Sequence, residues 1–259
     1  MAALSGFAYE TYYLGIRTTR RFTRVPANVV SIVFFPLIQL LVFSQLYKDI
    51  VQLPGFGEQT SYLAYLAPGQ VAFTALMAVA WSGYGLLIEY RSGYLDKLRA
   101  NPIARWSILA GEMVPLFFQA AMMAGVVLIV SLLLGAQLVT GVGGFLLILA
   151  LSGLFGVSFA GVSFVPALLT KSEQATSTLS LLLFPLVFIS TAFVPQALMP
   201  GWMQVVNDYN PVTYVIEAIR TLMVTGYDWG AIGTALLSMV ILGGVLQAAT
   251  LWAFHRLAD

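Results

Sequence analysis

Residues Glu89–Glu112 read EYRSGYLDKLRANPIARWSILAGE, a charged stretch inside an otherwise apolar sequence. No charged residue occurs from Gln59 to Ile88 before it, or from Met113 to Thr170 after it. A helix of about 20 apolar residues is enough to cross the hydrocarbon core of a bilayer. We therefore expect this stretch, which we call the polar island, to lie in water between membrane spans. The alternative is an ordinary basic loop between helices.

The composition of the whole chain also indicates a membrane protein. Its mean hydropathy is +0.89, and 59% of its residues are hydrophobic while 9% are charged. The apolar runs are continuous and longer than the tilted strands of a barrel, and helices satisfy their own backbone hydrogen bonds in lipid. We predict an all-α polytopic membrane protein. Because the chain has no cysteine, a disulfide framework and a thiolate metal site are excluded.

The apolar runs and the turn residues between them predict six transmembrane helices in one domain, 1–259. The run from Met113 to Thr170 is too long for one helix, and the glycine-rich stretch 135–144 divides it. Pro36 and Pro185 predict bends within the first and fifth spans. The predicted spans are 26–47, 64–88, 108–134, 145–169, 176–194 and 231–254.

Residues 1–25 predict a helix that lies on the membrane surface. Four arginines fall at positions i, i+3, i+4 and i+7, which places them on one helical face beside an apolar strip. Such a helix would rest its apolar side in the headgroup region. The alternative is a solvated basic tail. The four residues are Arg17, Arg20, Arg21 and Arg24.

The segment 195–230 fits neither a membrane span nor an ordinary loop. Asn210 followed by Pro211 predicts a helix start, with a capping side chain and then a proline at the first helical position. Apolar residues then recur at helical spacing, which predicts an amphipathic helix of about four turns, too short to cross the bilayer. We expect a re-entrant or interfacial hairpin in which Glu217 and Arg220 are paired or face water.

The basic residues predict the orientation of the chain. Of the 12 lysines and arginines, all but Lys48 and Arg220 fall on the side of the polar island when six spans are counted. Such an excess is typical of cytoplasmic loops. We therefore expect a multi-pass protein of the plasma (inner) membrane, with both termini and the polar island in the cytoplasm. The residues on that side are Arg17, Arg20, Arg21, Arg24, Arg91, Lys97, Arg99, Arg105, Lys171 and Arg256.

Several kinds of chemistry are missing from the sequence. His255 is the single histidine, so neither a serine–histidine pair nor a metal site is expected, and we predict no catalytic centre. No lysine follows a glycine, which excludes the phosphate-binding loop of a nucleotidase. A pump of this kind would take its energy from a separate ATPase. Gln39, Gln70 and Gln119 are interpreted as interhelical hydrogen-bond partners, and substrate contact is the alternative.

Two motifs resemble those of the permease subunits of type-2 ATP-binding-cassette (ABC) exporters, and among them the daunorubicin-resistance-like drug and lipid exporters. Pro68 and Gly69 are similar to a pair that opens the second span in that family. The chain departs from the pattern at Glu112, where lysine is frequent, and at Thr191, where glycine is common. The first motif comprises Glu89, Gly93, Leu95, Asp96, Leu98, Pro102, Ile103, Arg105 and Gly111, and the second comprises Phe193, Pro195, Pro200, Gly201, Trp202, Asn210, Pro211, Tyr214, Glu217 and Arg220.

The resemblance implies a cytoplasmic coupling helix within the segment 89–107, docked on a partner ABC ATPase. That ATPase is expected as a dimer that binds Mg-ATP, and the N-terminal helix would pack on it. A second permease copy or a paralogue would complete the transporter, with the hairpin at its outer mouth. The coupling residues are Gly93, Tyr94, Leu95, Asp96, Lys97, Leu98, Arg99 and Arg105, and those of the hairpin are Pro200, Trp202, Asn210, Pro211, Tyr214, Glu217 and Arg220.

We therefore expect the membrane subunit of an exporter of hydrophobic or amphipathic drug or lipid-like molecules, surrounded by membrane lipids. It would have no enzyme activity, no cofactor of its own and no nucleic-acid partner. Alternatives are the permease of a polysaccharide or lipid-linked glycan exporter and a non-transporting scaffold. The substrate pathway is predicted at Phe73, Met77, Phe184 and Phe188, for which packing or lipid contact is the alternative.

Overall fold

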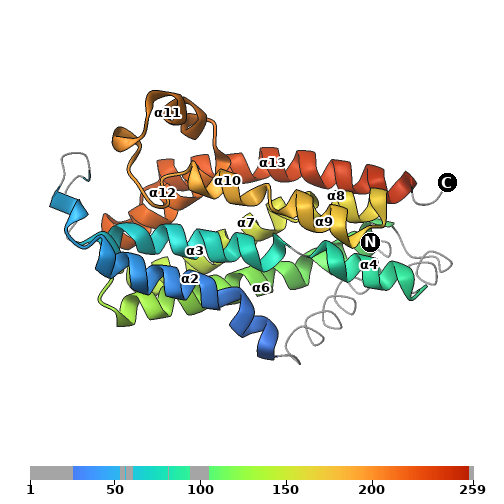
Figure 1. Ribbon diagram of the computed structural model, residues 1–259, viewed down its shortest axis with the longest axis horizontal. Helices are drawn as coiled ribbons and strands as arrows, with labels where there is room; N and C mark the ends of the chain where they lie inside the picture. The colour runs from blue at the N-terminus through green and yellow to red at the C-terminus, as the bar shows by residue number, and fades with distance from the viewer. Residues whose placement is uncertain (1–25, 53–55, 57–60, 81, 94–104, 257–259) are drawn as a thin grey trace.

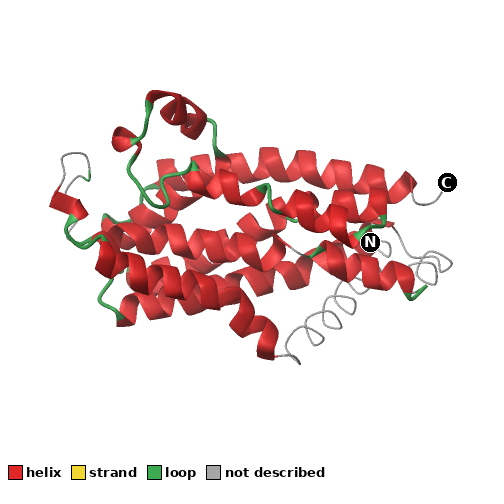
Figure 2. Cartoon of the chain, viewed as in Figure 1, coloured by secondary structure: helices red, strands yellow, loops and turns green. Residues whose placement is uncertain are grey.

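The protein is all-helical wherever its structure is defined. The computed structural model describes residues 26–52, 56, 61–80, 82–93 and 105–256. These residues form helices and turns, and none of them lies in a β-strand (Figure 2). The all-α prediction is confirmed for this part of the chain. The predicted surface helix, 1–25, lies outside the described residues, as does most of the predicted coupling segment.

Most of the helices run along the long axis of the molecule (Figure 1). Their labels are those of Figure 1. The bounds are α2 Pro26–Leu46, η1 Ile50–Gln52, α3 Tyr62–Ala80, α4 Gly83–Arg91, α6 Arg105–Leu133, α7 Gly141–Phe159, α8 Gly161–Thr170, α9 Glu173–Ser180, α10 Leu183–Phe188, η2 Gln196–Leu198, α11 Gly201–Asp208, α12 Pro211–Val224 and α13 Trp229–Arg256.

Four helical stretches among the described residues are long and apolar enough to cross a membrane. They agree with the second, third, fourth and sixth predicted spans. The first predicted span is α2, whose apolar part, Ile32–Leu46, is shorter than these four. The four stretches are Tyr62–Arg91, Ala110–Leu133, Gly141–Thr170 and Trp229–Arg256.

The fifth predicted span is two short helices, α9 and α10, rather than one bent helix. The helical path is interrupted at Leu181 and Leu182, where Leu182 donates its backbone N–H to the carbonyl of Leu179, three residues back, at 3.1 Å. Pro185 lies in the first turn of α10, where the missing N–H of a proline is tolerated. The break therefore precedes the proline, at which the sequence alone predicted a bend.

Helix α3 lies at the centre of the bundle. Every residue of α3 except Leu63 is buried, and the helix packs against α2, α6, α7 and α12. A Cβ added at Gly69 would lie 2.6 Å from the carbonyl oxygen of Ala192. Glycine at this position lets two backbones approach more closely than a larger side chain allows. Among the neighbours of α3 are the hairpin helix α12 and helix α6, which follows the polar island.

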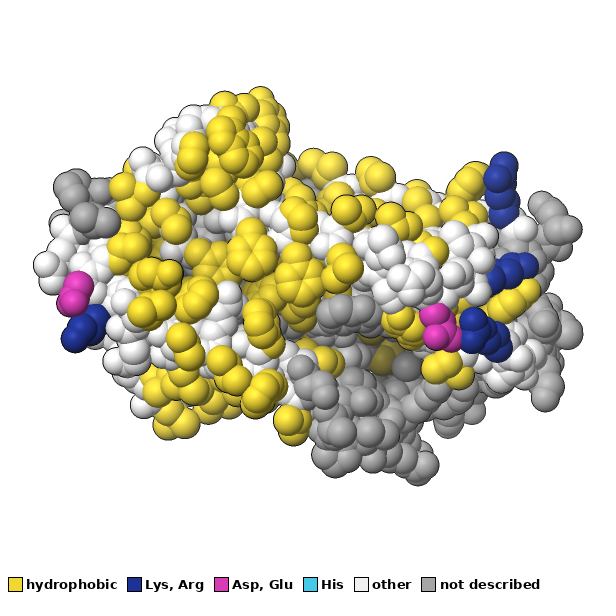
Figure 3. All heavy atoms as spheres, in the orientation of Figure 1, with side chains coloured by type: hydrophobic (Ala, Val, Ile, Leu, Met, Phe, Trp, Pro, Cys, Tyr) yellow, Lys and Arg dark blue, Asp and Glu magenta, His cyan; other side chains and the backbone are white. Residues whose placement is uncertain are grey.

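The polarity of the surface changes along the length of the molecule. On the face shown in Figure 3, charged side chains lie toward the two ends and apolar side chains cover the length between them. Exposed apolar residues include Phe34 and Ile38 on α2, and Leu237, Val240 and Ile241 on α13. An apolar belt between two charged ends is typical of a surface that lies in a bilayer.

Candidate functional site

Helix α12 begins as its sequence predicts. The side-chain oxygen of Asn210 accepts a hydrogen bond from the backbone N–H of Val212 at 3.0 Å, and Pro211 is the first helical residue. The Asn210 amide nitrogen also donates to the carbonyl oxygen of Leu186 at 2.6 Å. One side chain therefore caps α12 and ties its start to α10.

Arg220, two turns further along α12, is buried with 7% of its surface exposed. Its guanidinium donates to the carbonyl oxygens of Tyr65 at 2.5 Å and Thr191 at 2.7 Å. It also donates to the Glu217 carboxylate at 3.2 Å and lies 3.9 Å from the centroid of the Tyr65 ring. A buried charge is tolerated only when it is paired and hydrogen-bonded in this way. The predicted pairing of Glu217 with Arg220 is present, inside the molecule.

The same contacts join three segments that are distant in sequence. The Tyr65 hydroxyl donates to the carbonyl of Thr191 at 2.9 Å, and the Thr191 hydroxyl donates to the Glu217 carboxylate. One turn earlier on α3, the Tyr62 hydroxyl donates to the carbonyl of Phe193 at 3.0 Å. We call Tyr65, Thr191, Glu217 and Arg220 the arginine cluster. It fastens the start of α3, the turn after α10 and helix α12 to one another.

No local pattern in the sequence points to the roles of Tyr62 and Tyr65. Their hydrogen bonds reach residues 131 and 126 positions away. Tyrosines at the start of a span are ordinary interface residues. Thr191, which departs from the family pattern, supplies the hydroxyl that meets Glu217.

Helix α11 projects from the bundle at the end where α12 lies (Figure 1). Pro200 precedes it, and Trp202 on it is 64% exposed. The Tyr214 hydroxyl donates to the backbone carbonyl of Asp208 at its end. The predicted hairpin residues are therefore divided between this exposed helix and the buried helix α12.

The polar island begins at the opposite end of the molecule, where α4 ends. Arg91 forms an ion pair with Glu173 at the start of α9, with 2.5 Å between Nη1 and Oε1. The Lys171 ammonium lies 4.8 Å from the centroid of the Tyr90 ring. Gly93 has a positive φ of 66°, which ends the helical path. The island's start and the turn before α9 thus lie together. Of the other predicted coupling residues, Tyr94, Leu95, Asp96, Lys97, Leu98 and Arg99 lie outside the described residues, and Arg105 begins α6.

Two of the predicted pathway residues are in contact. The rings of Phe73 on α3 and Phe184 on α10 meet edge to face, with 5.9 Å between centroids. Met77 is buried one turn further along α3. Phe188 lies apart from them: it is 47% exposed and stacks on Phe193 at 5.2 Å.

The three glutamines differ in their surroundings. The Gln119 amide on α6 donates to the carbonyl of Ala78 on α3 at 2.8 Å, which confirms an interhelical hydrogen bond. Gln70 is fully buried, and among the described residues neither the nitrogen nor the oxygen of its amide group has a hydrogen-bond partner. The carbonyl oxygen of the Gln39 side chain is likewise buried without a partner in this part of the chain. The interpretation as an interhelical hydrogen bond is confirmed for Gln119, whereas for Gln70 the described residues supply no such bond.

No group of three or more histidine, aspartate or glutamate side chains that could hold a metal ion occurs within the described ranges. What the geometry offers is mechanical: a hydrogen-bonded fastening at one end, an ion-paired junction at the other, and a buried helix, α3, that packs against α12 and against α6, the helix that follows the polar island.

The chain is similar to known membrane transport proteins over most of its length. Residues 9–224 match the model of the family described as ABC-2 type transporter. The chain is 31% identical to "Daunorubicin resistance ABC transporter permease protein DrrB1" of Streptomyces coeruleorubidus, over 80% of this chain and 72% of that one. It is 22% identical to "Probable doxorubicin resistance ABC transporter permease protein DrrC" of Mycobacterium tuberculosis (strain CDC 1551 / Oshkosh), over 85% and 79%. It is 20% identical to "Probable multidrug ABC transporter permease YbhR" of Escherichia coli (strain K12), over 81% and 57%. The chain belongs to the ABC-2 type transporter family and is similar over 80–85% of its length to these permease subunits of ABC transporters.

Proposed function

We propose that this chain is the membrane-spanning subunit of an exporter that moves hydrophobic or amphipathic drug or lipid-like molecules outward. ATP would be hydrolysed by a separate ABC ATPase, expected as a dimer. The observation that carries the proposal is the family match over residues 9–224, together with relatives named for daunorubicin and doxorubicin resistance. A second copy of this chain or a paralogue would complete the complex.

The arrangement in the membrane is part of the proposal. Six spans in the inner membrane would place both termini and the polar island on its cytoplasmic side. Residues 195–230 would form a re-entrant hairpin on the opposite side. The contact between Arg91 and Glu173 supports this, because it joins two segments that six spans assign to the cytoplasmic side. The arginine cluster supports it at the other end, where the predicted outer segments meet.

Coupling would pass through the segment 89–107, with Leu95 and Leu98 seated in a groove of the ATPase. Motion of that segment can reach α6, which begins at Arg105, and α9, through the ion pair of Arg91 with Glu173. At the other end the arginine cluster would make α12, the start of α3 and the turn after α10 move together. Packed interfaces shift between discrete arrangements rather than deforming continuously. The three segments held by the arginine cluster would therefore move as one rigid unit.

The substrate pathway would run beside one face of α3. Gln70, Phe73 and Met77 share that face, since they are spaced i, i+3 and i+7. Phe184 of α10 contacts it. A fully buried amide without a partner is unfavourable in the resting protein, and a polar group of a passing substrate would relieve that cost.

Transport in inside-out vesicles tests the function. Vesicles that contain the chain and its copurified ATPase should accumulate daunorubicin, used as the probe, when ATP is supplied. Absence of ATP-driven uptake for daunorubicin and for a fluorescent phospholipid would overturn the proposal.

The Gln70→Leu substitution tests the pathway. We expect export to fall several-fold while the melting temperature of the complex is kept or raised, because an apolar side chain of similar size removes the unpaired amide. The matched control, Gln119→Leu, loses a hydrogen bond to Ala78 and should lower the melting temperature instead. Unchanged export in Gln70→Leu would remove Gln70 from the pathway.

A further inference from the structure

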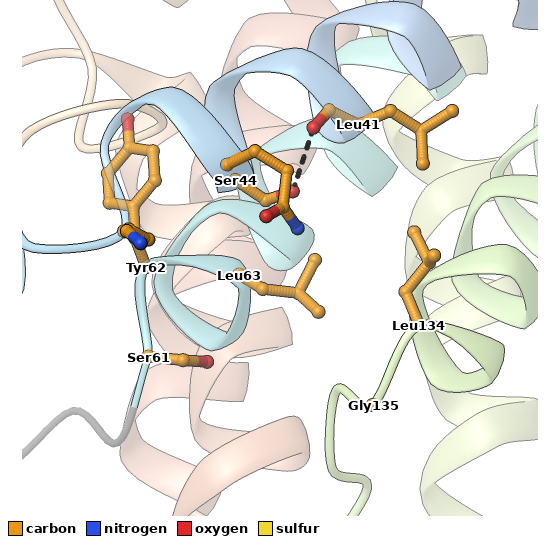
Figure 4. A pocket seen from close by; sticks show the side chains of 9 residues that line it. Leu41, Ser44, Ser61, Tyr62, Leu63, Leu134 and Gly135 are labelled. Carbon is orange, nitrogen blue, oxygen red and sulfur yellow. Dashed lines mark hydrogen bonds between the residues drawn. The ribbon is translucent and has the colours of Figure 1, made fainter.

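A cavity of about 290 Å³ lies at the ends of three helices (Figure 4). It lies between the end of α2, the start of α3 and the end of α6. It is separate from the arginine cluster and from the rings of Phe73 and Phe184, none of which lines it.

The lining of this cavity divides into an apolar part and a polar part. Leu41, Leu63 and Leu134 supply the apolar part, and the side chains of Leu63 and Leu134 lie on facing sides of the gap (Figure 4). Lys48 and Gln45 contribute an ammonium and an amide. A site with this division suits a ligand that has an ionic head and an apolar chain.

The position of the cavity along the helices indicates its depth in the membrane. α2 ends at Leu46, α3 begins at Tyr62 and α6 ends at Leu133. These are the points where the apolar helices end, which in a membrane is the level of the lipid headgroups. A lysine there extends its stem along apolar surface and presents its charge to the headgroups.

At this end of the molecule, Lys48 is the described basic side chain that is available to bind a ligand. Of the basic side chains in the described part of the chain, Arg220 shares this end, and its guanidinium is buried and occupied by three acceptors. Lys48 is exposed and lines the cavity. A ligand that fills this cavity would place an anionic group at Lys48 and an apolar chain against the three leucines. An anionic headgroup attached to an acyl chain has both parts.

We propose that this cavity is a binding site for a membrane phospholipid. The phosphate of the headgroup is held by the ammonium of Lys48 and the amide of Gln45. The first methylenes of an acyl chain lie against Leu41, Leu63 and Leu134. This site is independent of the export function, because it requires only that these helix ends lie at the membrane surface.

Site-resolved photo-crosslinking in the full complex tests the proposal. The complex is placed in vesicles of phosphatidylethanolamine and phosphatidylglycerol that carry a trace of phosphatidylglycerol with a diazirine near the carboxyl end of one acyl chain. Labelling is expected on peptides that contain Leu63 and Leu134. Lys48→Gln should reduce it about tenfold, the value of one charge-assisted hydrogen bond, whereas Lys48→Arg should retain it. Labelling of the exposed face of α13, at Val240, provides the internal control because it reports lipid that contacts any apolar surface.

Further arms separate the possible sources of the signal. Leu63→Trp should fill the apolar part and reduce labelling although the charge remains, while Lys171→Gln at the opposite end should have no effect. A diazirine-bearing diacylglycerol without phosphate should label these peptides weakly. Equal labelling in Lys48→Gln and the parent chain would overturn the proposal. So would displacement of the lipid by millimolar inorganic phosphate, because that result indicates a site for free anions.

Discussion

At the scale of single residues, Arg220 shows why a charge is stable inside this protein. Its planar guanidinium reaches two backbone carbonyls and one carboxylate and stacks on an aromatic ring at the same time. A lysine in its place would offer one compact ammonium and no planar fork. The position therefore depends on geometry as well as on charge.

Replacing Glu217 tests how much the carboxylate contributes to this cluster. Glu217→Ala removes the anionic partner of Arg220 and the acceptor of the Thr191 hydroxyl. The loss should destabilise the complex by about 1–3 kcal/mol, the cost of leaving buried donors unsatisfied, and should impair export. Thermal unfolding and vesicle uptake measure the two effects.

The matched control is Glu173→Ala at the other end of the molecule. Its ion pair with Arg91 is about half exposed, with 57% and 51% of the two side chains accessible. Exposed pairs of this kind contribute about 0–1 kcal/mol. Equal melting temperatures for Glu217→Ala and the parent chain, with unchanged uptake, would mean that the carboxylate is dispensable.

At the scale of elements, the close approach of α3 to the turn after α10 leads to a second prediction. Gly69→Ala would place a Cβ 2.6 Å from the carbonyl oxygen of Ala192 and force the two segments apart. Such overpacking should lower stability by about 1–3 kcal/mol. Gly244→Ala on α13 is the control, because a Cβ there meets no atom within 4 Å. If both variants melt at the same temperature, the contact is not tight.

The elements differ in how far the sequence could predict them. Helices α3, α6, α7 and α13 follow from uninterrupted apolar runs, and the start of α12 follows from Asn210 and Pro211, because in each case the signal is local. The division of the fifth predicted span into α9 and α10 was missed, because the break at Leu181 and Leu182 falls in an apolar run that carries no local turn signal. Two of the four members of the arginine cluster, Glu217 and Arg220, were predicted as a pair. The pair within α12 could be inferred from spacing, whereas the partners on α3 and after α10 depend on tertiary packing.

At the scale of the whole molecule, the chain should have one charged end in the cytoplasm and the other outside. The absence of cysteine makes this simple to test with single-cysteine variants and a membrane-impermeant maleimide. Ser92→Cys, within the polar island, should react only from the cytoplasmic side. Tyr209→Cys, at a position that is 83% exposed after α11, should react only from outside. Labelling of both variants from the same side would contradict the proposed topology.

The proposed function requires that an ATPase drive this permease through the polar island. The most direct test is the double variant Leu95→Asp, Leu98→Asp, with measurement of the ATPase that copurifies with the chain and of ATP-driven uptake in vesicles. Charged side chains should prevent docking in an apolar groove, because burying an unpaired carboxylate is strongly unfavourable. We predict normal membrane insertion, loss of the bound ATPase and loss of uptake. Full retention of the ATPase and unchanged uptake would contradict the claim.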